Sequence, residues 1–182
     1  MQISETTSLE PIADHHAEPT FELIDNNRAH LKTWLPWVDF MQSVENFRNF
    51  IKGAKQRMTD KQEVSYMIMH EGKVVGRVGL YYIDHQNKIG SIGYWLGEEF
   101  QGKGIVTKAC KEVIKTGFTD LGLNRIEIKC ATGNTRSQAI PERLGFTKEG
   151  VLRQAEQVNG QFHDLNLYSM LKQEWEKDSM HL

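Results

Sequence analysis

Apolar side chains in the first sixty residues recur mainly at helical spacing. Within 20–35 they fall three or four positions apart, and Pro36 limits that helix because the residue before a proline disfavours the α conformation. Ser43 suits the N-cap of a second helix over 44–58. We therefore expect a short N-terminal strand followed by two helices. The inward face of the second helix is formed by Val44, Phe47, Phe50, Ile51 and Ala54.

Residues 63–96 change to the two-residue period that is typical of β-strands. Segments 64–69 and 74–83 alternate apolar and polar positions, and Gly72 between them suits a tight hairpin turn. A third β-like segment, 88–96, follows a polar turn. The simplest interpretation is three successive antiparallel strands.

The second half of the chain alternates helices and strands. Apolar spacing predicts a helix over 104–121 that ends at Gly122, then a buried strand over 124–131. Asn134 is placed to cap a further helix that ends near 144–146.

The last two predicted strands are 147–157 and 161–171, and the Asn159-Gly160 pair between them is a strong hairpin signal. The expected order is β, α, α, β, β, β, α, β, α, β, β. We find no repeat, low-complexity tract or linker, so we expect one domain over residues 1–182, with its core at about 8–172.

A glycine-bearing turn at 97–104 leads from a predicted strand into a predicted helix. The first N–H groups of a helix have no intrahelical partner, and glycine lets a phosphate approach the backbone, so this turn predicts an anion site. Residues 97–103 fit the G-x-x-x-x-G-K pattern of a P-loop, but Gly104 stands where Ser or Thr should hold Mg²⁺. A dinucleotide turn would need G-x-G-x-x-G, which the turn lacks. The third interpretation is the pyrophosphate loop of acyl-CoA-dependent N-acyltransferases. Its usual signature is Gln or Arg, two residues, Gly, one residue, then Gly or Ala, and residues 101–106 fit it except that Val106 replaces the small last residue.

Composition narrows the class of protein. The 182 residues have a formal net charge of -2, which gives no reason to expect nucleic-acid binding. No run of about 18 apolar residues is present, and the acidic N-terminus is unlike a secretory signal, so we expect no membrane partner. Cys110 and Cys130 are expected to be buried, reduced thiols of a cytoplasmic protein. No spacing of ligand residues predicts a metal site.

A second motif, Asn134-Thr135-Arg136-Ser137 followed by Gly145-Phe146, lies one helix and one strand beyond the glycine loop. Together the two motifs resemble those of the GCN5-related N-acetyltransferase (GNAT) superfamily. The block from Asn27-Arg28 to Trp34-Leu35-Pro36-Trp37, with 93–96 and 166–168, is similar to the RimJ/RimL-like branch. The resemblance implies an α+β GNAT fold, with a mixed, mostly antiparallel central sheet of about seven strands flanked by four helices. It also implies acetyl-CoA as acyl donor, no metal, and the N-terminal α-amine of a ribosomal protein as acceptor.

The resemblance also implies where acetyl-CoA binds. The pantetheine arm would pair with the end of the strand at Trp95 and Leu96, where a main-chain N–H can stabilise the oxyanion. Asn134 would reach the pantetheine or cap its helix, and it could do both. Lys103 and Lys108 would be cationic ligands or solvated side chains. The pyrophosphate would lie on Gln101, Gly102, Lys103, Gly104, Ile105, Val106 and Thr107.

In RimL-like enzymes a Glu on the strand after the second motif is the proposed base, acting through water, and Glu156 matches it here. The alternative for Glu156 is a solvated hairpin carboxylate. Ser137 matches the donor to the departing thiolate, and its alternative is a helix cap. Tyr168 is a second candidate for that donor, or part of the core. Pro141 has no N–H for the Ser137 carbonyl, so we expect an irregular helix and a free carbonyl at the site.

Other polar and aromatic residues have simpler expected roles. We expect His15 and His16 at the surface, and His163 and Asp164 to be solvated. Trp34, Trp37 and Phe40 would form core or cleft wall, and a groove lined by them would favour a peptide acceptor.

Two alternative functions remain open: acetylation of a small amine such as a polyamine, antibiotic or amino acid, and an acyl-CoA sensor without catalysis. Exposed strand edges indicate a homodimer.

Overall fold

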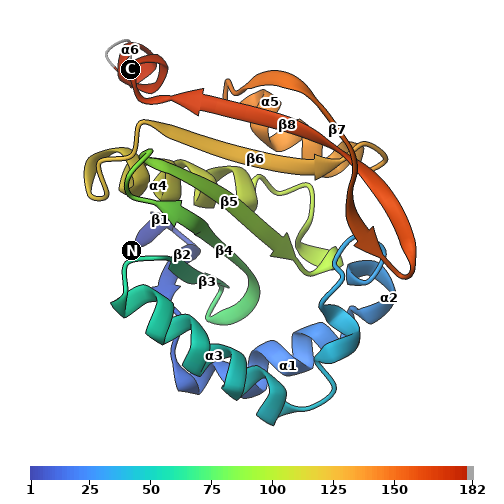
Figure 1. Ribbon diagram of the computed structural model, residues 1–182. Coiled ribbons are helices and arrows are strands. Elements are labelled where there is room, and N and C mark those ends of the chain that lie inside the picture. The colour runs from blue at the N-terminus through green and yellow to red at the C-terminus, as the bar shows by residue number, and fades with distance from the viewer. Residues whose placement is uncertain (180–182) are drawn as a thin grey trace.

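The computed structural model describes residues 1–179 and contains one eight-stranded sheet (Figure 1). Its spatial order is β1-β2-β3-β4-β5-β6-β8-β7, and every neighbouring pair is antiparallel except β5–β6. The mixed, mostly antiparallel sheet is confirmed. The strands are β1 (Gln2–Ser4), β2 (Thr7–Pro11), β3 (Val64–His70), β4 (Lys73–Asp84), β5 (Ile89–Leu96), β6 (Arg125–Ala131), β7 (Thr147–Val158) and β8 (Gln161–Leu171).

Within residues 1–179 the sheet has eight strands where about seven were expected, and there are six helices where four were expected. The N-terminus forms a hairpin of two strands, the first predicted helix is divided at Asn27, and a last helix follows β8. Three 3-10 turns, η1 (Asp14–His16), η2 (Val38–Phe40) and η3 (Glu98–Phe100), complete the described part. The helices are α1 (Ala17–Asn26), α2 (Arg28–Leu31), α3 (Val44–Thr59), α4 (Ile105–Thr119), α5 (Thr135–Arg143) and α6 (Lys172–Ser179).

Local sequence signals account for most boundaries. The Ser43 hydroxyl accepts the N–H of Asn46, and the Asn134 side chain accepts the N–H of Ser137, so both predicted caps are confirmed. The β7–β8 turn is the predicted Asn159-Gly160 pair, and both residues have positive φ, as a two-residue hairpin turn requires.

Two hydrophobic clusters lie on opposite faces of the sheet. Helices α1 and α3 pack on one face, with Leu23, Ile51 and Trp95 in their cluster. Helix α4 packs on the other face through residues such as Val113 and Phe118. None of the helices within residues 1–179 combines the length and the hydropathy needed to cross a membrane.

Strands β5 and β6 pair over only part of their length. The parallel ladder runs from Ile89 opposite Arg125 to Ile92 opposite Ile128. The following residues of the two strands, 93–96 and 129–131, have no partner in this ladder, and the strands diverge there (Figure 1). This divergence positions the candidate site.

Candidate active site

A cleft of about 250 Å³ opens where β5 and β6 diverge. Its walls come from the segment after α2, from four strands and from the start of α5. Of the residues predicted for the site, Trp95, Asn134, Ser137 and Glu156 all line this one cleft. The other lining residues are Trp34, Leu35, Trp37, Arg77, Tyr81, Ile92, Gly93, Tyr94, Lys129, Cys130 and Ala131.

The open edge of β5 faces this cleft with main-chain groups. The N–H of Gly97 donates to the carbonyl of Val75 at 2.9 Å, which fixes the alternation of the ladder with β4. In an antiparallel ladder every second residue points its N–H and C=O away from the neighbour. The main-chain groups of Tyr94 and Leu96 therefore point toward β6, on the side where β5 has no partner. Leu96 itself is buried.

The glycine loop ends in a helix whose first amides have no side-chain cap. Gly102 and Gly104 both have left-handed backbone, with φ of 76° and 71°, and Gly104 is the N-cap of α4. A Cβ added at either glycine would meet nothing within 4 Å. The buried side chains of Ile105 and Val106 anchor the first turn below. The loop therefore combines free amides with space above them, as anion binding requires.

The cations near this loop lie at its surface. Lys103 and Lys108 are exposed, and the ammonium of Lys103 lies 5.3 Å from the centroid of the Phe100 ring. Thr107 is half-buried on the first turn of α4.

Gln101 joins three segments that are distant in the sequence. Its side-chain nitrogen lies 2.8 Å from Nε2 of His30, and its oxygen accepts from Arg136 at 2.6 Å. Nearby, the side-chain oxygen of Asn27 accepts the N–H of Glu98 at 2.9 Å. Sequence reasoning missed His30 and Arg136. The only signal for them was that their segments carry family motifs.

Glu156 reaches the cleft because β7 contains a bulge. The register of β7 against β8 shifts between Leu152 and Glu156, and Gln154 within the bulge has a φ of 50°. The Gln154 N–H donates to the carboxylate of Asp164 at 2.8 Å, so Asp164 supports the bulge. A bulge redirects the side chains that follow it.

The cleft changes the acidity of Glu156. The side chain is half-buried, and burial raises the pKa of its carboxyl, while the charge of His163 opposite it in the ladder acts in the reverse direction. A raised pKa suits a carboxylate that has to accept a proton near neutral pH.

Ser137, which also lines the cleft, lies in a small polar cluster. Its hydroxyl is 3.3 Å from the sulfur of Cys130 and 3.2 Å from the hydroxyl of Tyr94. Its N–H is held by Asn134, so Asn134 both caps α5 and lines the cleft. Burial raises the pKa of Cys130, so that side chain is a neutral thiol.

Helix α5 continues through Pro141 to Arg143, and the Ser137 carbonyl accepts a hydrogen bond from the Tyr94 hydroxyl at 2.9 Å. The carbonyl that faces the missing N–H of Pro141 therefore accepts from a side chain of β5.

Tyr168 belongs to the core. Its hydroxyl donates to Glu142 at 3.0 Å, only 1% of the residue is exposed, and it is not among the residues that line the cleft. Burial, followed by the contact with Glu142, raises the pKa of Tyr168 to about 12.

The segment after α2 and the β7–β8 hairpin, which both contribute to the cleft wall, contact each other. Asn159, at the tip of the β7–β8 hairpin, donates to the carbonyl of Lys32 at 2.9 Å. The ring of Trp34 meets that of His163 edge to face, with centroids 6.3 Å apart, and a Cβ at Gly133 would lie 3.1 Å from the Trp34 ring. Trp34 and Trp37 form cleft wall, whereas Phe40 is 75% exposed and does not line the cleft.

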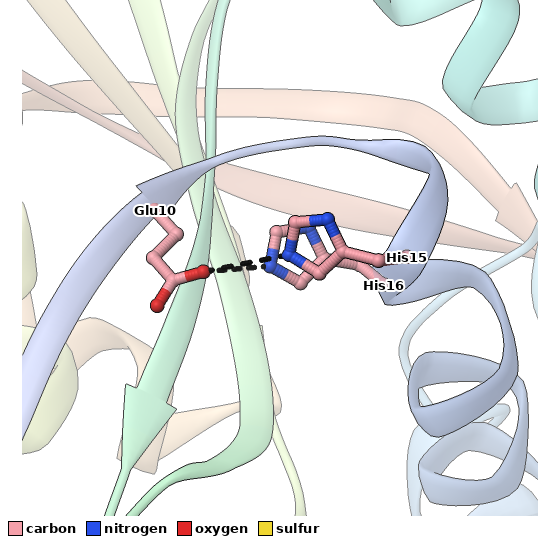
Figure 2. A group of neighbouring side chains, drawn as sticks. All are labelled: Glu10, His15 and His16. Carbon is pink, nitrogen blue, oxygen red and sulfur yellow. Dashed lines mark hydrogen bonds and ion pairs between the residues drawn. The ribbon is translucent and has the colours of Figure 1, made fainter.

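Outside the cleft, Glu10, His15 and His16 form a compact group before α1 (Figure 2). The expected surface position of His16 was wrong: it is 1% exposed, its Nε2 lies 3.1 Å from the Glu10 carboxylate, and its Nδ1 accepts the N–H of Ala13. Nδ1 therefore carries a lone pair, and in the neutral ring Nε2 carries the proton. A nitrogen that carries a proton cannot ligate a metal, so this arrangement favours a structural role at the start of α1.

Comparisons with known proteins agree with this geometry. Residues 7–147 match the family model described as Acetyltransferase (GNAT) domain. The putative ribosomal N-acetyltransferase YdaF of Bacillus subtilis (strain 168) is 37% identical, and the alignment covers 96% of each chain. The ribosomal-protein-serine acetyltransferase of Escherichia coli (strain K12) is 34% identical over 94% of this chain and 96% of its own.

Among solved structures, the microcin C7 self-immunity acetyltransferase MccE, in complex with acetyl-CoA and AMP, superposes with a TM-score of 0.89. It is 35% identical, and the match covers 94% of this chain and 95% of that one.

Proposed function

The chain belongs to the GNAT acetyltransferase family, and we propose that it transfers the acetyl group of acetyl-CoA to the N-terminal α-amine of a protein. The observation that carries this proposal is the convergence of Glu156, Ser137 and the unpaired edge of β5 on one cleft. These three features supply a proton acceptor, a hydrogen-bond donor to the departing thiolate, and an edge that can bind an extended cofactor arm.

Acetyl-CoA would occupy the divergence of β5 and β6. The pantetheine arm pairs with the main-chain groups of Tyr94 and Leu96, beside Trp95 and within reach of Asn134. The pyrophosphate binds the amides of 101–107, where the α4 dipole favours negative charge.

The reaction is a direct attack of the amine on the thioester. The amine nitrogen forms the new C–N bond, and its surplus proton passes through a water to Glu156. A main-chain N–H of the β5 edge stabilises the oxyanion. The C–S bond then breaks, and Ser137 donates a hydrogen bond to the departing thiolate, which takes its proton from solvent.

The aromatic mouth of the cleft favours a peptide acceptor. Trp34 and Trp37 present flat apolar surfaces beside Glu156, which suit the first side chains that follow an α-amine. The two ribosomal-protein acetyltransferases among the relatives support the same acceptor class. A small-molecule amine is the second candidate, since the AMP in the MccE complex indicates that this architecture also accommodates small ligands.

The test is an acceptor screen with acetyl-CoA. Peptides with the N-termini of ribosomal proteins would be incubated beside the same peptides with blocked N-termini, polyamines and amino acids, and acetylation read by mass spectrometry. Acetylation of the free α-amine alone supports the proposal. Preference for a small amine would overturn the acceptor assignment, and release of no CoA with any amine would favour the sensor alternative.

We also place the enzyme in the cytoplasm as a homodimer. The buried free thiols Cys110 and Cys130 suit a reducing compartment. Strand β7 is an edge of the sheet with Val151 and Leu152 exposed, which suits pairing with a second copy. Light scattering of the purified chain tests the dimer, and a monomeric mass at micromolar concentration would refute it.

A further inference from the structure

The carbonyl of Ser137 lacks its usual main-chain donor. In an α-helix this oxygen accepts the N–H of the residue four positions later, which is Pro141. Proline has no N–H, so the carbonyl must find another partner or lose a hydrogen bond.

Tyr94 provides that partner from a different part of the fold. Its hydroxyl, on β5, crosses the divergence between the strands and donates to the Ser137 carbonyl at 2.9 Å. A phenol has a single proton, and a carbonyl can only accept, so this proton is committed. Toward the Ser137 hydroxyl, 3.2 Å away, the Tyr94 oxygen can therefore act only as an acceptor.

This arrangement determines the role of the Ser137 hydroxyl. Its proton has Tyr94 and the Cys130 sulfur as neighbouring acceptors, and both are weak because burial keeps the phenol and the thiol neutral. A developing thiolate in the cleft is a stronger, charged acceptor and would take this hydrogen bond.

We propose that Tyr94 is a positioning residue for acetyl transfer. Its hydroxyl supplies the hydrogen bond that Pro141 cannot donate, and it thereby holds Ser137 as the hydroxyl that donates to the thiolate. The inference rests on the proposed function, in which Ser137 meets the sulfur of CoA. Tyr94 itself does not donate to the sulfur, because its proton is already used.

The proline allows a rescue experiment. Tyr94→Phe removes the hydroxyl and leaves the ring, and we expect kcat to fall about tenfold, with the KM for acetyl-CoA changed less than about twofold. Pro141→Ala restores a main-chain N–H at the right position. The double variant Tyr94→Phe/Pro141→Ala should therefore recover most of the lost kcat. The loss caused by Tyr94→Phe, measured against Pro141→Ala alone, should be much smaller than the loss measured against the wild type.

Two further variants separate positioning from a general structural effect. Tyr168→Phe removes another buried hydroxyl that bonds to α5, at Glu142 outside the cleft, and should keep the kcat of the wild type. In a Ser137→Ala background, Tyr94→Phe should cause no further loss, since Tyr94 acts through Ser137.

Either of two results overturns the inference: a Tyr94→Phe variant with the kcat of the wild type, or a double variant no better than Tyr94→Phe alone. If the wild type transfers no acetyl group, the proposed function is wrong. The unfolding free energies of the same variants then decide the structural part, because Tyr94→Phe should cost less stability in the Pro141→Ala background than in the wild type. Equal costs in the two backgrounds would refute the hydrogen bond itself.

Discussion

Glu156 is the residue on which the chemistry depends most directly, and its removal as a base should affect turnover more than binding. In Glu156→Gln the side chain keeps its size but cannot accept the proton of the amine. We expect kcat to fall by about 100-fold or more, with the Kd of acetyl-CoA unchanged. Steady-state kinetics and calorimetry measure the two effects. Glu149→Gln is the matched control, because Glu149 lies on the same strand but pairs with Arg125 away from the cleft, and its activity should stay near that of the wild type.

The same residue predicts a pH dependence. Burial places the pKa of Glu156 above its usual 4.5, and only the ionised form accepts a proton, so kcat/KM should fall as the pH drops through that raised pKa. Glu156→Gln should lose this acidic limb while keeping its low residual rate. An acidic limb of unchanged midpoint in Glu156→Gln would assign the titration to another group.

At the scale of elements, the glycine loop before α4 should tolerate side chains poorly. Alanine at Gly102 or Gly104 has to adopt a left-handed backbone, which costs about 1–2 kcal/mol of unfolding free energy. The new Cβ also stands in the space above the amides, so we expect the Kd of acetyl-CoA to rise about tenfold or more. Gly150→Ala is the control, since Gly150 has open space around it and no left-handed φ. Equal Kd values for all three variants would show that the pyrophosphate does not bind at this loop.

The start of α1 predicts a different pH effect, on stability. Burial is the main cause that lowers the pKa of His16 below its usual value of 6.5. Above pH 6.5 the ring is neutral in both states, whereas below it the unfolded chain takes up a proton that the folded chain resists. The contribution of His16 should therefore lower the unfolding free energy as the pH falls from about 6.5 toward the folded pKa.

Urea unfolding between pH 7.5 and 5 measures this slope. His16→Asn keeps an acceptor for the Ala13 N–H but cannot titrate, so its stability should decrease less over this range than that of the wild type. His15→Asn, on the exposed neighbour, should retain the wild-type slope. If His16→Asn shows the wild-type slope as well, the titrating group lies elsewhere.

Elements fixed by neighbouring residues could be predicted from the sequence, and those fixed by distant partners could not. The caps at Ser43 and Asn134 and the turn at Asn159-Gly160 depend only on residues a few positions away. Strand β1 is short and polar, and it pairs with β2, whose other partner β3 lies more than fifty residues along the chain.

The candidate site divides in the same way. The glycine loop and the Asn134 segment are local motifs, and the sequence predicted both the glycine turn into α4 and the Asn134 cap. The direction of Glu156 depends on a bulge that Asp164 supports from the next strand. The contacts of Gln101 with His30 and Arg136, and that of Ser137 with Tyr94, join residues 35 to 71 positions apart. A local pattern of residues does not show which distant residues will meet in the fold.

At the scale of the whole molecule, the binding site spans elements from both halves of the chain, so acetyl-CoA should stabilise the entire fold. At one hundred times its Kd, a ligand adds about 2.7 kcal/mol, which for a chain of this size raises Tm by roughly 5–10 °C. Thermal unfolding with acetyl-CoA, CoA and Mg-ATP in parallel tests this. Acetyl-CoA and CoA should raise Tm and Mg-ATP should not. A rise in Tm with Mg-ATP alone would favour the interpretation of the glycine loop as a P-loop.

The divergence of β5 and β6 also bears on self-association. A strand edge with unpaired main-chain groups normally attracts further β-strands and promotes aggregation. Here the unpaired edge lies inside a cleft of about 250 Å³, and the hydrogen bond between Asn159 and Lys32 links the two segments that carry Trp34 and Glu156. In the proposed function the pantetheine arm follows this edge, and the protein acceptor presents its terminal amine to the same cleft. The fold thereby keeps one β-edge available to its cofactor within a cleft in the middle of the sheet and not at its outer rim.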